Sequence, residues 1–263
     1  MDLGLRGRVA MVGGASRGLG RAIAHALAAE GAHVAMLARR AGPLRDAARE
    51  IAAATGAELL PLQVDVTDPA QVDGAVAAVV ARWGALHIVV ANAGGPPSTR
   101  FDGTSAAQVE EALRLNLMST VYQATASVPH MRAAGWGRFI ALTSVSVKQP
   151  MPGLILSNTA RAGVVGWVKT MANELAGEGI TCNVVAPGYF STDRTEELAA
   201  VRAERSGRTA PEVLAEMAAR VPMGRMGDPA EMGAVVAFLA SERASYLNGV
   251  TLQVDGGFVQ GLL

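Results

Sequence analysis

A glycine-rich segment lies between the first apolar run of the chain and its first long helical pattern. It reads Gly-Gly-Ala-Ser-Arg-Gly-Leu-Gly over residues 13–20, directly after the apolar residues 8–13. Glycine lets a backbone turn tightly and approach a phosphate, and a following helix offers free N–H groups and the positive end of its dipole. With a strand before the loop and a helix after it, the pattern predicts a site for a dinucleotide pyrophosphate. A plain turn is the alternative interpretation.

Two arginines follow the second apolar run. In dinucleotide-binding proteins the residues at this place distinguish NAD from NADP. A protein that prefers NAD places Asp or Glu there to bind the ribose 2′-hydroxyl, whereas this chain has Ala38, Arg39 and Arg40. Guanidinium groups suit a 2′-phosphate through charge-assisted hydrogen bonds, and Arg17 in the glycine-rich loop adds a third. We therefore expect NADP(H) rather than NAD(H). The alternative is that Arg39 and Arg40 form a solvated helix start.

Short apolar runs alternate with Ala-rich helical stretches along the whole chain. Helices are expected at residues 19–30, 44–54, 69–83, 105–131, 158–176 and 229–240, and strands at residues 8–13, 33–38, 59–64, 87–91, 138–143, 180–185 and 250–254. Apolar strands separated by helices indicate a parallel sheet that is covered on both faces. We expect an α/β fold with a doubly wound sheet of about seven strands (Rossmann type), forming a single domain over residues 1–263.

One polar, Arg-rich stretch, residues 189–225, interrupts the alternation. We interpret it as a helical excursion that covers a site and sets the choice of substrate. A pair of surface helices with no such role is the alternative.

The composition narrows the classes of partner. The chain has 263 residues, half of them hydrophobic, and 23 basic against 23 acidic side chains. A net charge of zero argues against a whole-domain role in binding nucleic acid or an anionic membrane. The single cysteine, Cys182, excludes an internal disulfide framework, and the four histidines lack metal-ligand spacing, so no metal is expected. Without a signal-like start or an apolar run of about 18 residues, the sequence predicts a soluble, cytoplasmic protein.

Further motifs follow in an order that resembles the short-chain dehydrogenase/reductase family over essentially the whole chain. They are Gly14-x3-Gly18-x-Gly20, Asp65-Val66, Asn92-Ala93-Gly94, Asn116, Ser144, and Pro187-Gly188 with Thr192. Within that family, the sequence as a whole resembles the bacterial oxoacyl-carrier-protein reductase-like members. The resemblance implies a set of cofactor-binding residues: Gly14, Ser16, Arg17, Gly18, Leu19, Gly20, Arg39, Arg40, Asp65, Val66, Asn92, Ala93, Gly94, Arg161, Pro187, Gly188 and Thr192.

The resemblance breaks at the catalytic pair. The family places a Tyr about a dozen residues after the Ser, and a Lys four residues later. In that register this chain has Ser157 and Arg161, and no Tyr-x3-Lys occurs anywhere in the sequence. The catalytic positions implied here are therefore Asn116, Ser144, Ser157 and Arg161. Lys148 and Tyr189 are weaker candidates for a substitute acid.

The replacement removes the usual proton donor. A Ser hydroxyl is a much weaker acid than a phenol, and Arg161 cannot accept a proton at working pH. Losing general acid–base help costs roughly 10²–10⁴ in rate, yet hydride delivery by proximity and an oxyanion site could survive it. Plain structural roles are open as well: Ser157 as a helix N-cap, and Arg161 as a surface or phosphate-facing cation.

Three functions are compatible with this sequence. The first is an NADP(H)-dependent oxidoreductase that acts on a small carbonyl, alcohol or C=N substrate with a non-standard proton donor. The second is a regulatory or structural NADP(H)-binding protein without redox turnover. The third is a non-redox lyase or isomerase that reuses the pocket. By analogy with the family we also expect a homotetramer or homodimer, packed through helices in residues 105–131 and 158–176.

Overall fold

The computed structural model describes residues 1–262, without the side chain of residue 205. Seven parallel strands form one sheet in the order β3-β2-β1-β4-β5-β6-β7. They are β1 (Val9–Gly13), β2 (His33–Ala38), β3 (Leu59–Gln63), β4 (Ile88–Ala91), β5 (Gly137–Leu142), β6 (Ile180–Pro187) and β7 (Thr251–Val254). The doubly wound fold predicted from the sequence is thereby confirmed.

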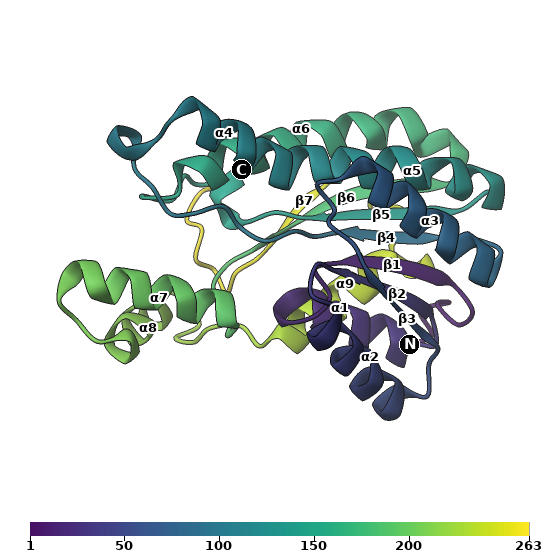
Figure 1. Ribbon diagram of the computed structural model, residues 1–263, viewed down its shortest axis with the longest axis horizontal. Coiled ribbons are helices and arrows are strands. Elements are labelled where there is room, and N and C mark those ends of the chain that lie inside the picture. The colour runs from purple at the N-terminus through teal and green to yellow at the C-terminus, as the bar shows by residue number, and fades with distance from the viewer. Residues whose placement is uncertain (263) are drawn as a thin grey trace.

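Nine α-helices connect and cover these strands within the described part of the chain. They are α1 (Gly18–Ala29), α2 (Ala41–Thr55), α3 (Pro69–Trp83), α4 (Ala106–Leu113), α5 (Ser119–Ala134), α6 (Ile155–Leu175), α7 (Asp193–Ser206), α8 (Ala210–Ala219) and α9 (Pro229–Ala240). Figure 1 shows α1, α2 and α9 on one face of the sheet and α3 to α6 on the other. No helix in residues 1–262 has both the length and the apolar character needed to cross a bilayer.

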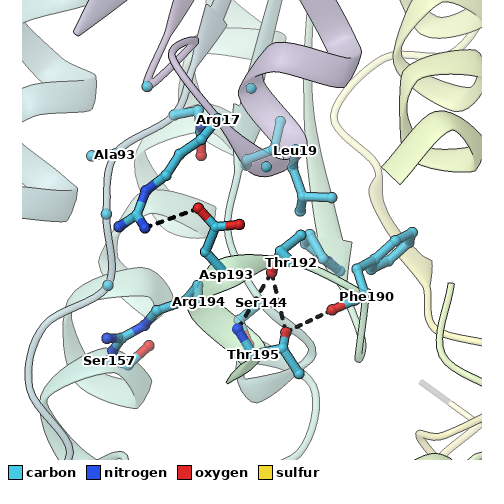
Figure 2. Close-up of a pocket in the computed structure, with 18 of the residues that line it drawn as sticks. Arg17, Leu19, Ala93, Ser144, Ser157, Phe190, Thr192, Asp193, Arg194 and Thr195 are labelled. Carbon is cyan, nitrogen blue, oxygen red and sulfur yellow. Dashed lines mark hydrogen bonds and ion pairs between the residues drawn. The ribbon is translucent and has the colours of Figure 1, made fainter. Parts of the chain in front are cut away.

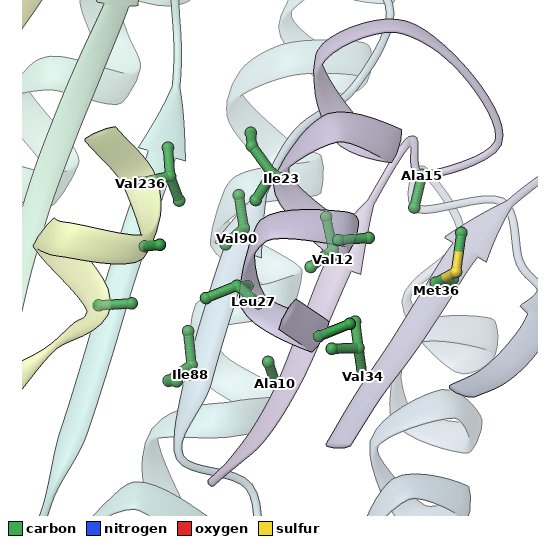
Figure 3. Packing of buried hydrophobic residues seen from close by; sticks show 14 of the residues in the cluster. Ala10, Val12, Ala15, Ile23, Leu27, Val34, Met36, Ile88, Val90 and Val236 are labelled. Atoms are coloured by element: carbon green, nitrogen blue, oxygen red, sulfur yellow. The ribbon is translucent and has the colours of Figure 1, made fainter. Parts of the chain in front are cut away.

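Alternating residues of the strands feed two apolar cores, one on each face of the sheet. In β1, Ala10 and Val12 pack with α1 and α9, while Val9 and Met11 pack with α3, α5 and α6. Figure 3 shows Ile23 and Leu27 of α1 lying over the first of these faces. Because every β1 residue is buried, this strand reads as a continuous apolar run rather than an alternating one.

The ends of several helices follow from local chemistry. Asp68 caps α3 by accepting hydrogen bonds from the N–H groups of Ala70 and Gln71, and Pro69 lies at the first helical position. Gly84 ends the same helix with a φ of 76°, a left-handed conformation that residues with a side chain rarely adopt. These signals explain why the sequence predicted residues 69–83 correctly.

Two helical predictions need correction. The single helix expected over residues 105–131 is divided into α4 and α5 by a π-helical turn, Arg114–Met118, which opens the winding by one residue. The helix expected from residue 158 begins earlier, at Ile155, so that Ser157 lies inside α6 rather than before it.

The carboxyl ends of all seven strands lie at one edge of the sheet. The strand order reverses between β1 and β4, which in doubly wound sheets leaves a crevice for a ligand outside these ends. The stretch 189–225, which contains α7 and α8, leaves this edge after β6. In Figure 1 the α7–α8 pair stands apart from the helices that cover the sheet.

Candidate active site

A cavity of about 800 Å³ runs along the carboxyl edge of the sheet. Every residue predicted to bind the cofactor lines it, together with Ser144 and Ser157. The fold therefore brings the predicted set together from the loops that follow β1 to β6.

The glycine-rich loop is packed too closely for a side chain at Gly14 or Gly20. A Cβ on Gly20 would lie 2.4 Å from the carbonyl oxygen of Gly14 and 2.9 Å from Nδ2 of Asn92. Asn92 in turn donates from Nδ2 to the carbonyl oxygen of Gly13, at 3.0 Å, which ties the loop after β4 to the loop after β1. The loop thus forms a bare backbone cradle at the crevice.

The cradle opens onto the start of α1. Arg17 is the N-cap of this helix and makes no side-chain capping bond, so the first N–H groups of α1 are left for another acceptor. Gly18 adopts a φ of 56°, and a Cβ there would approach only Thr192, at 3.6 Å. Free N–H groups, a helix dipole and a bare backbone suit a diphosphate, so these residues fit the predicted dinucleotide.

The structure corrects the role expected for Arg17. Its guanidinium Nη1 bonds to Asp193, at 3.1 Å, and to Glu197, at 3.0 Å, rather than standing free for a 2′-phosphate. Hydrogen bonds to these two carboxylates raise the pKa of Arg17. Arg17 therefore links the cofactor loop to α7, whereas Arg39 and Arg40 are exposed on the cavity wall.

Asn116 does not reach the cavity, contrary to the expectation that it is a catalytic residue. It lies in the π-helical turn, is 4% exposed, and donates from Nδ2 to the carbonyl oxygen of Gly94, at 3.0 Å. Asn116 is therefore a positioning residue, because it holds the loop after β4 in place.

Ser157 and Arg161 form a buried pair on one turn of α6. Arg161 donates from Nε to Oγ of Ser157, at 3.2 Å, and from Nη1 to the carbonyl oxygens of Leu142 (3.1 Å) and Thr143 (2.8 Å). The helix α6 begins at Ile155, and its N-cap is Leu154. The N-cap interpretation of Ser157 is therefore wrong, because its hydroxyl accepts from a side chain within the helix.

Burial also rules out Arg161 as a surface cation. The residue is 8% exposed, and its three hydrogen-bond acceptors are uncharged. Burial, and secondarily the charge of Arg194, lower the pKa of Arg161 to about 10. The guanidinium still carries its charge at neutral pH, and it does so without a bonded carboxylate among residues 1–262.

The remaining candidates for proton chemistry differ in placement. Ser144 lines the cavity, but its Oγ accepts a hydrogen bond from the N–H of Ser146, at 3.2 Å. Tyr189 lines the cavity too, and its buried hydroxyl has no partner among the described residues. Lys148 ends the short 3₁₀ turn Val145–Val147 and is not part of the cavity wall, so it is no substitute acid here.

The sequence offered Arg194 only as one of several arginines in residues 189–225 that hint weakly at an anionic substrate or carrier, or form a solvated helix face. Arg194 lies in the first turn of α7, lines the cavity, and donates from Nη2 to the carbonyl oxygen of Pro96, at 3.0 Å. Figure 2 shows its side chain reaching from α7 toward Ser157. Its position two residues after Thr192 was the only further signal, since nothing local distinguishes it from the other arginines of this stretch.

Comparisons with known proteins identify relatives over nearly the whole chain. Residues 14–259 match the family model described as enoyl-(acyl carrier protein) reductase. The chain is 36% identical over 255 residues to the 3-oxoacyl-[acyl-carrier-protein] reductase of Salmonella typhimurium. This alignment covers 97% of the present chain and 98% of the relative. The Aquifex aeolicus enzyme of the same name is 33% identical and covers 98% and 99% of the two chains.

Solved structures show the same fold in proteins that bind NADPH. L-sorbose reductase from Gluconobacter frateurii, complexed with NADPH and L-sorbose, superimposes with a TM-score of 0.95 at 33% identity and covers all of both chains. An NADPH-dependent reductase involved in bacilysin biosynthesis gives a TM-score of 0.91 at 26% identity and covers 97% and 99% of the chains.

Proposed function

Because the chain belongs to the short-chain dehydrogenase/reductase family, we propose that it transfers hydride between NADP(H) and a small carbonyl, alcohol or C=N substrate without a tyrosine proton donor. It is an NADP(H)-dependent oxidoreductase of this family. The observation that carries the finer proposal is the buried Ser157–Arg161 pair, which occupies the catalytic register and lines the cavity.

NADP(H) would be held by most of the residues that the sequence predicted for it, whereas Arg17 bonds to α7 and Arg161 is left to the substrate. The bare cradle of Gly14, Gly18 and Gly20 and the free N–H groups of α1 would take its diphosphate. Arg39 and Arg40 would pair with its 2′-phosphate. When bound, the nicotinamide donates or accepts the hydride.

Ser157 is suited to donate a hydrogen bond to the reacting oxygen. Its Oγ already accepts from Arg161, and its own proton has no acceptor among the described residues. A hydroxyl that accepts from a cation becomes a stronger donor. In the reducing direction the carbonyl carbon accepts a hydride, the π electrons move onto oxygen, and the resulting alkoxide lies against the Ser157 hydroxyl and the Arg161 charge.

Neither residue has to transfer the proton. Water entering the cavity would supply one proton to the alkoxide, and the Ser157–Arg161 pair would stabilise the oxyanion until that happens. Hydride transfer could therefore continue without the Tyr and Lys of the family, because water supplies the proton and the Ser157–Arg161 pair stabilises the oxyanion.

The first test is a comparison of cofactors and serine variants. We expect NADPH to bind more tightly than NADH when nicotinamide fluorescence is followed during titration. Ser157→Ala should lower kcat/KM with a reducible ketone by about 10²–10³-fold, while NADPH affinity stays unchanged. Ser146→Ala is the matched control, because that hydroxyl is buried nearby but lies outside the cavity wall.

The pH profile provides an independent readout. Since Ser157 does not titrate and the pKa of Arg161 is about 10, kcat should be flat from pH 6 to 9. It should fall only as the pH rises through about 10, where the guanidinium loses its charge. Tight NADPH binding without oxidation by any ketone, oxoacyl thioester or cyclic imine would contradict the redox proposal.

A further inference from the structure

The substrate end of the cavity carries more positive than negative charge. Two guanidinium groups, those of Arg161 and Arg194, lie there and are close enough for one to lower the pKa of the other. Of the acidic residues on the cavity wall, Asp193 and Glu197 both bond to Arg17. Glu197 also lies 3.5 Å from Nη1 of Arg194. The two carboxylates therefore pair with Arg17 and Arg194, and Arg161 is left without a bonded carboxylate among the described residues.

Arg161 presents one unused set of hydrogens to this space. Its Nη1 is occupied by the carbonyl oxygens of Leu142 and Thr143, and its Nε by the hydroxyl of Ser157. Its Nη2 has no hydrogen-bond partner in residues 1–262, although the residue is more than nine-tenths buried. Nε and Nη2 form one edge of the planar guanidinium. A ligand atom at Nη2 would thus be a neighbour of any atom bound to Ser157.

Arg194 is fixed on the opposite side of the same space. Its guanidinium lies across Gly95, where an added Cβ would be 3.4 Å from Nη2 and 3.5 Å from Nε. The bond from Nη2 to the carbonyl oxygen of Pro96 holds it there, and Figure 2 shows it directed toward Ser157. Its Nη1 faces Glu197, whereas its Nε has no hydrogen-bond partner among the described residues and is available to an anion.

We infer that the substrate is a small 2-oxo acid, or the 2-hydroxy acid in the reverse direction, whose carboxylate lies between Arg161 and Arg194 while its carbonyl oxygen accepts a hydrogen bond from Ser157. The inference rests on the proposed function. In a 2-oxo acid the two groups occupy adjacent carbons, which matches the adjacent donors Ser157 Oγ and Arg161 Nη2. One carboxylate also supplies the missing negative charge, whereas an uncharged ketone would leave a buried cation uncompensated.

The first experiment compares an acid with its own ester. NADPH oxidation is measured with 2-oxobutyrate and with methyl 2-oxobutyrate, which share the reacting carbonyl. We expect the wild-type enzyme to favour the acid in kcat/KM. Arg194→Met should reduce that preference, taken as the ratio of kcat/KM for acid over ester, by about 10- to 100-fold, because it removes hydrogen bonds to a charged group. Arg194→Lys, which keeps the charge but not the planar fork, should retain part of the preference.

Arg202→Met is the matched control, because Arg202 lies on the same helix but does not line the cavity. It should preserve the preference for the acid. Equal use of acid and ester by the wild type would overturn the inference while leaving the proposed function intact. An equal loss of preference in Arg202→Met would overturn it too, since the effect would then be one of general charge.

A binding measurement decides the matter without turnover. Oxamate has the shape and charge of a 2-oxo acid but is not reduced. In calorimetry with the enzyme saturated with NADPH, we expect it to bind the wild type and Arg202→Met, and to bind Arg194→Met about 10- to 100-fold more weakly. Failure of oxamate to bind the wild-type complex would reject the anionic substrate, even if uncharged ketones are reduced.

Discussion

At the residue scale, the unusual feature is a buried guanidinium, Arg161, in a position where the family has an amine. Arg161 is held by two main-chain carbonyl oxygens at the end of β5 and by Ser157. An amine on a flexible stem could not satisfy three acceptors in one plane as a guanidinium does. The replacement therefore fixes the cation in one orientation.

His87 makes the stability of the protein depend on pH. Its Nδ1 accepts a hydrogen bond from the N–H of Val9, at 3.0 Å, so the folded state needs the neutral ring. Burial, and then the charge of Arg8, lower the pKa of His87 below its ordinary value. The unfolded chain binds a proton more readily, so stability should be constant above about pH 6.5 and fall as the pH drops below it.

The test is urea unfolding at pH 7.0 and at pH 5.5. His87→Asn keeps an acceptor for Val9 but cannot be protonated, so this variant should lose less stability between the two pH values than the wild type. His25→Asn, which changes an exposed histidine of α1, should behave as the wild type does. Equal losses in all three proteins would show that His87 is not responsible.

At the scale of elements, the glycine-rich loop and α1 act as one unit. Gly20→Ala places a methyl group 2.4 Å from the carbonyl oxygen of Gly14, so the backbone must shift away from the cradle. We expect a loss of about 1–3 kcal/mol in unfolding free energy and a 10- to 100-fold loss of NADPH affinity, measured by thermal denaturation and fluorescence titration.

Gly74→Ala is the contrasting change. Gly74 lies inside α3, and a Cβ there would meet no described atom within 4 Å. This variant should gain about 0.5–1 kcal/mol through the unfolded chain and bind NADPH normally. A loss of NADPH affinity in both variants would mean that the crowding at Gly20 is not the cause.

The π-helical turn is a second case in which an element serves the site. It lies between α4 and α5 and carries Asn116, whose side chain holds the carbonyl oxygen of Gly94. If these residues formed a regular α-helix, the residues that follow the turn would face a different side of the helix. The turn thus sets where Asn116 points, although Asn116 itself stays outside the cavity.

At the scale of the whole molecule, we propose that the chain forms a homo-oligomer through the outer face of α6. This face carries Ala162 and Gly166 one turn apart, and Trp167, which is 37% exposed. A Cβ at Gly166 would meet no described atom within 4 Å. The small residues on this face would let a partner helix approach α6 closely.

Sedimentation velocity tests this proposal. The wild type should sediment as a dimer or tetramer, and Gly166→Arg should shift it toward the monomer without unfolding it. Gly74→Arg is the control. Gly74 lies in α3, which covers the same face of the sheet as α6, and its substitution should leave the oligomeric state unchanged. A wild type that sediments as a monomer at micromolar concentration would contradict the proposal.

The sequence by itself determined the features that depend on local pattern. The alternation of apolar strands with helices predicted the doubly wound sheet, and the bounds of β2, α3 and α9 agree with the expected ranges. Asp and Pro mark the start of both helices, and Gly84 marks the end of α3. The glycine-rich loop and the arginines after β2 predicted the cofactor, NADP(H). The absence of Tyr-x3-Lys was also evident without coordinates.

Only the tertiary structure decided how the charged side chains are paired. Arg17 lies 176 residues from Asp193 in sequence, and Arg194 lies 98 residues from Pro96, yet both pairs are in contact. The sequence assigned Arg161 to the site but left a surface cation as the alternative, because a single arginine on a helix gives no sign of the carbonyl oxygens that surround it. Such contacts arise from the packing of elements that are distant in sequence, and a local pattern of residues carries no record of them.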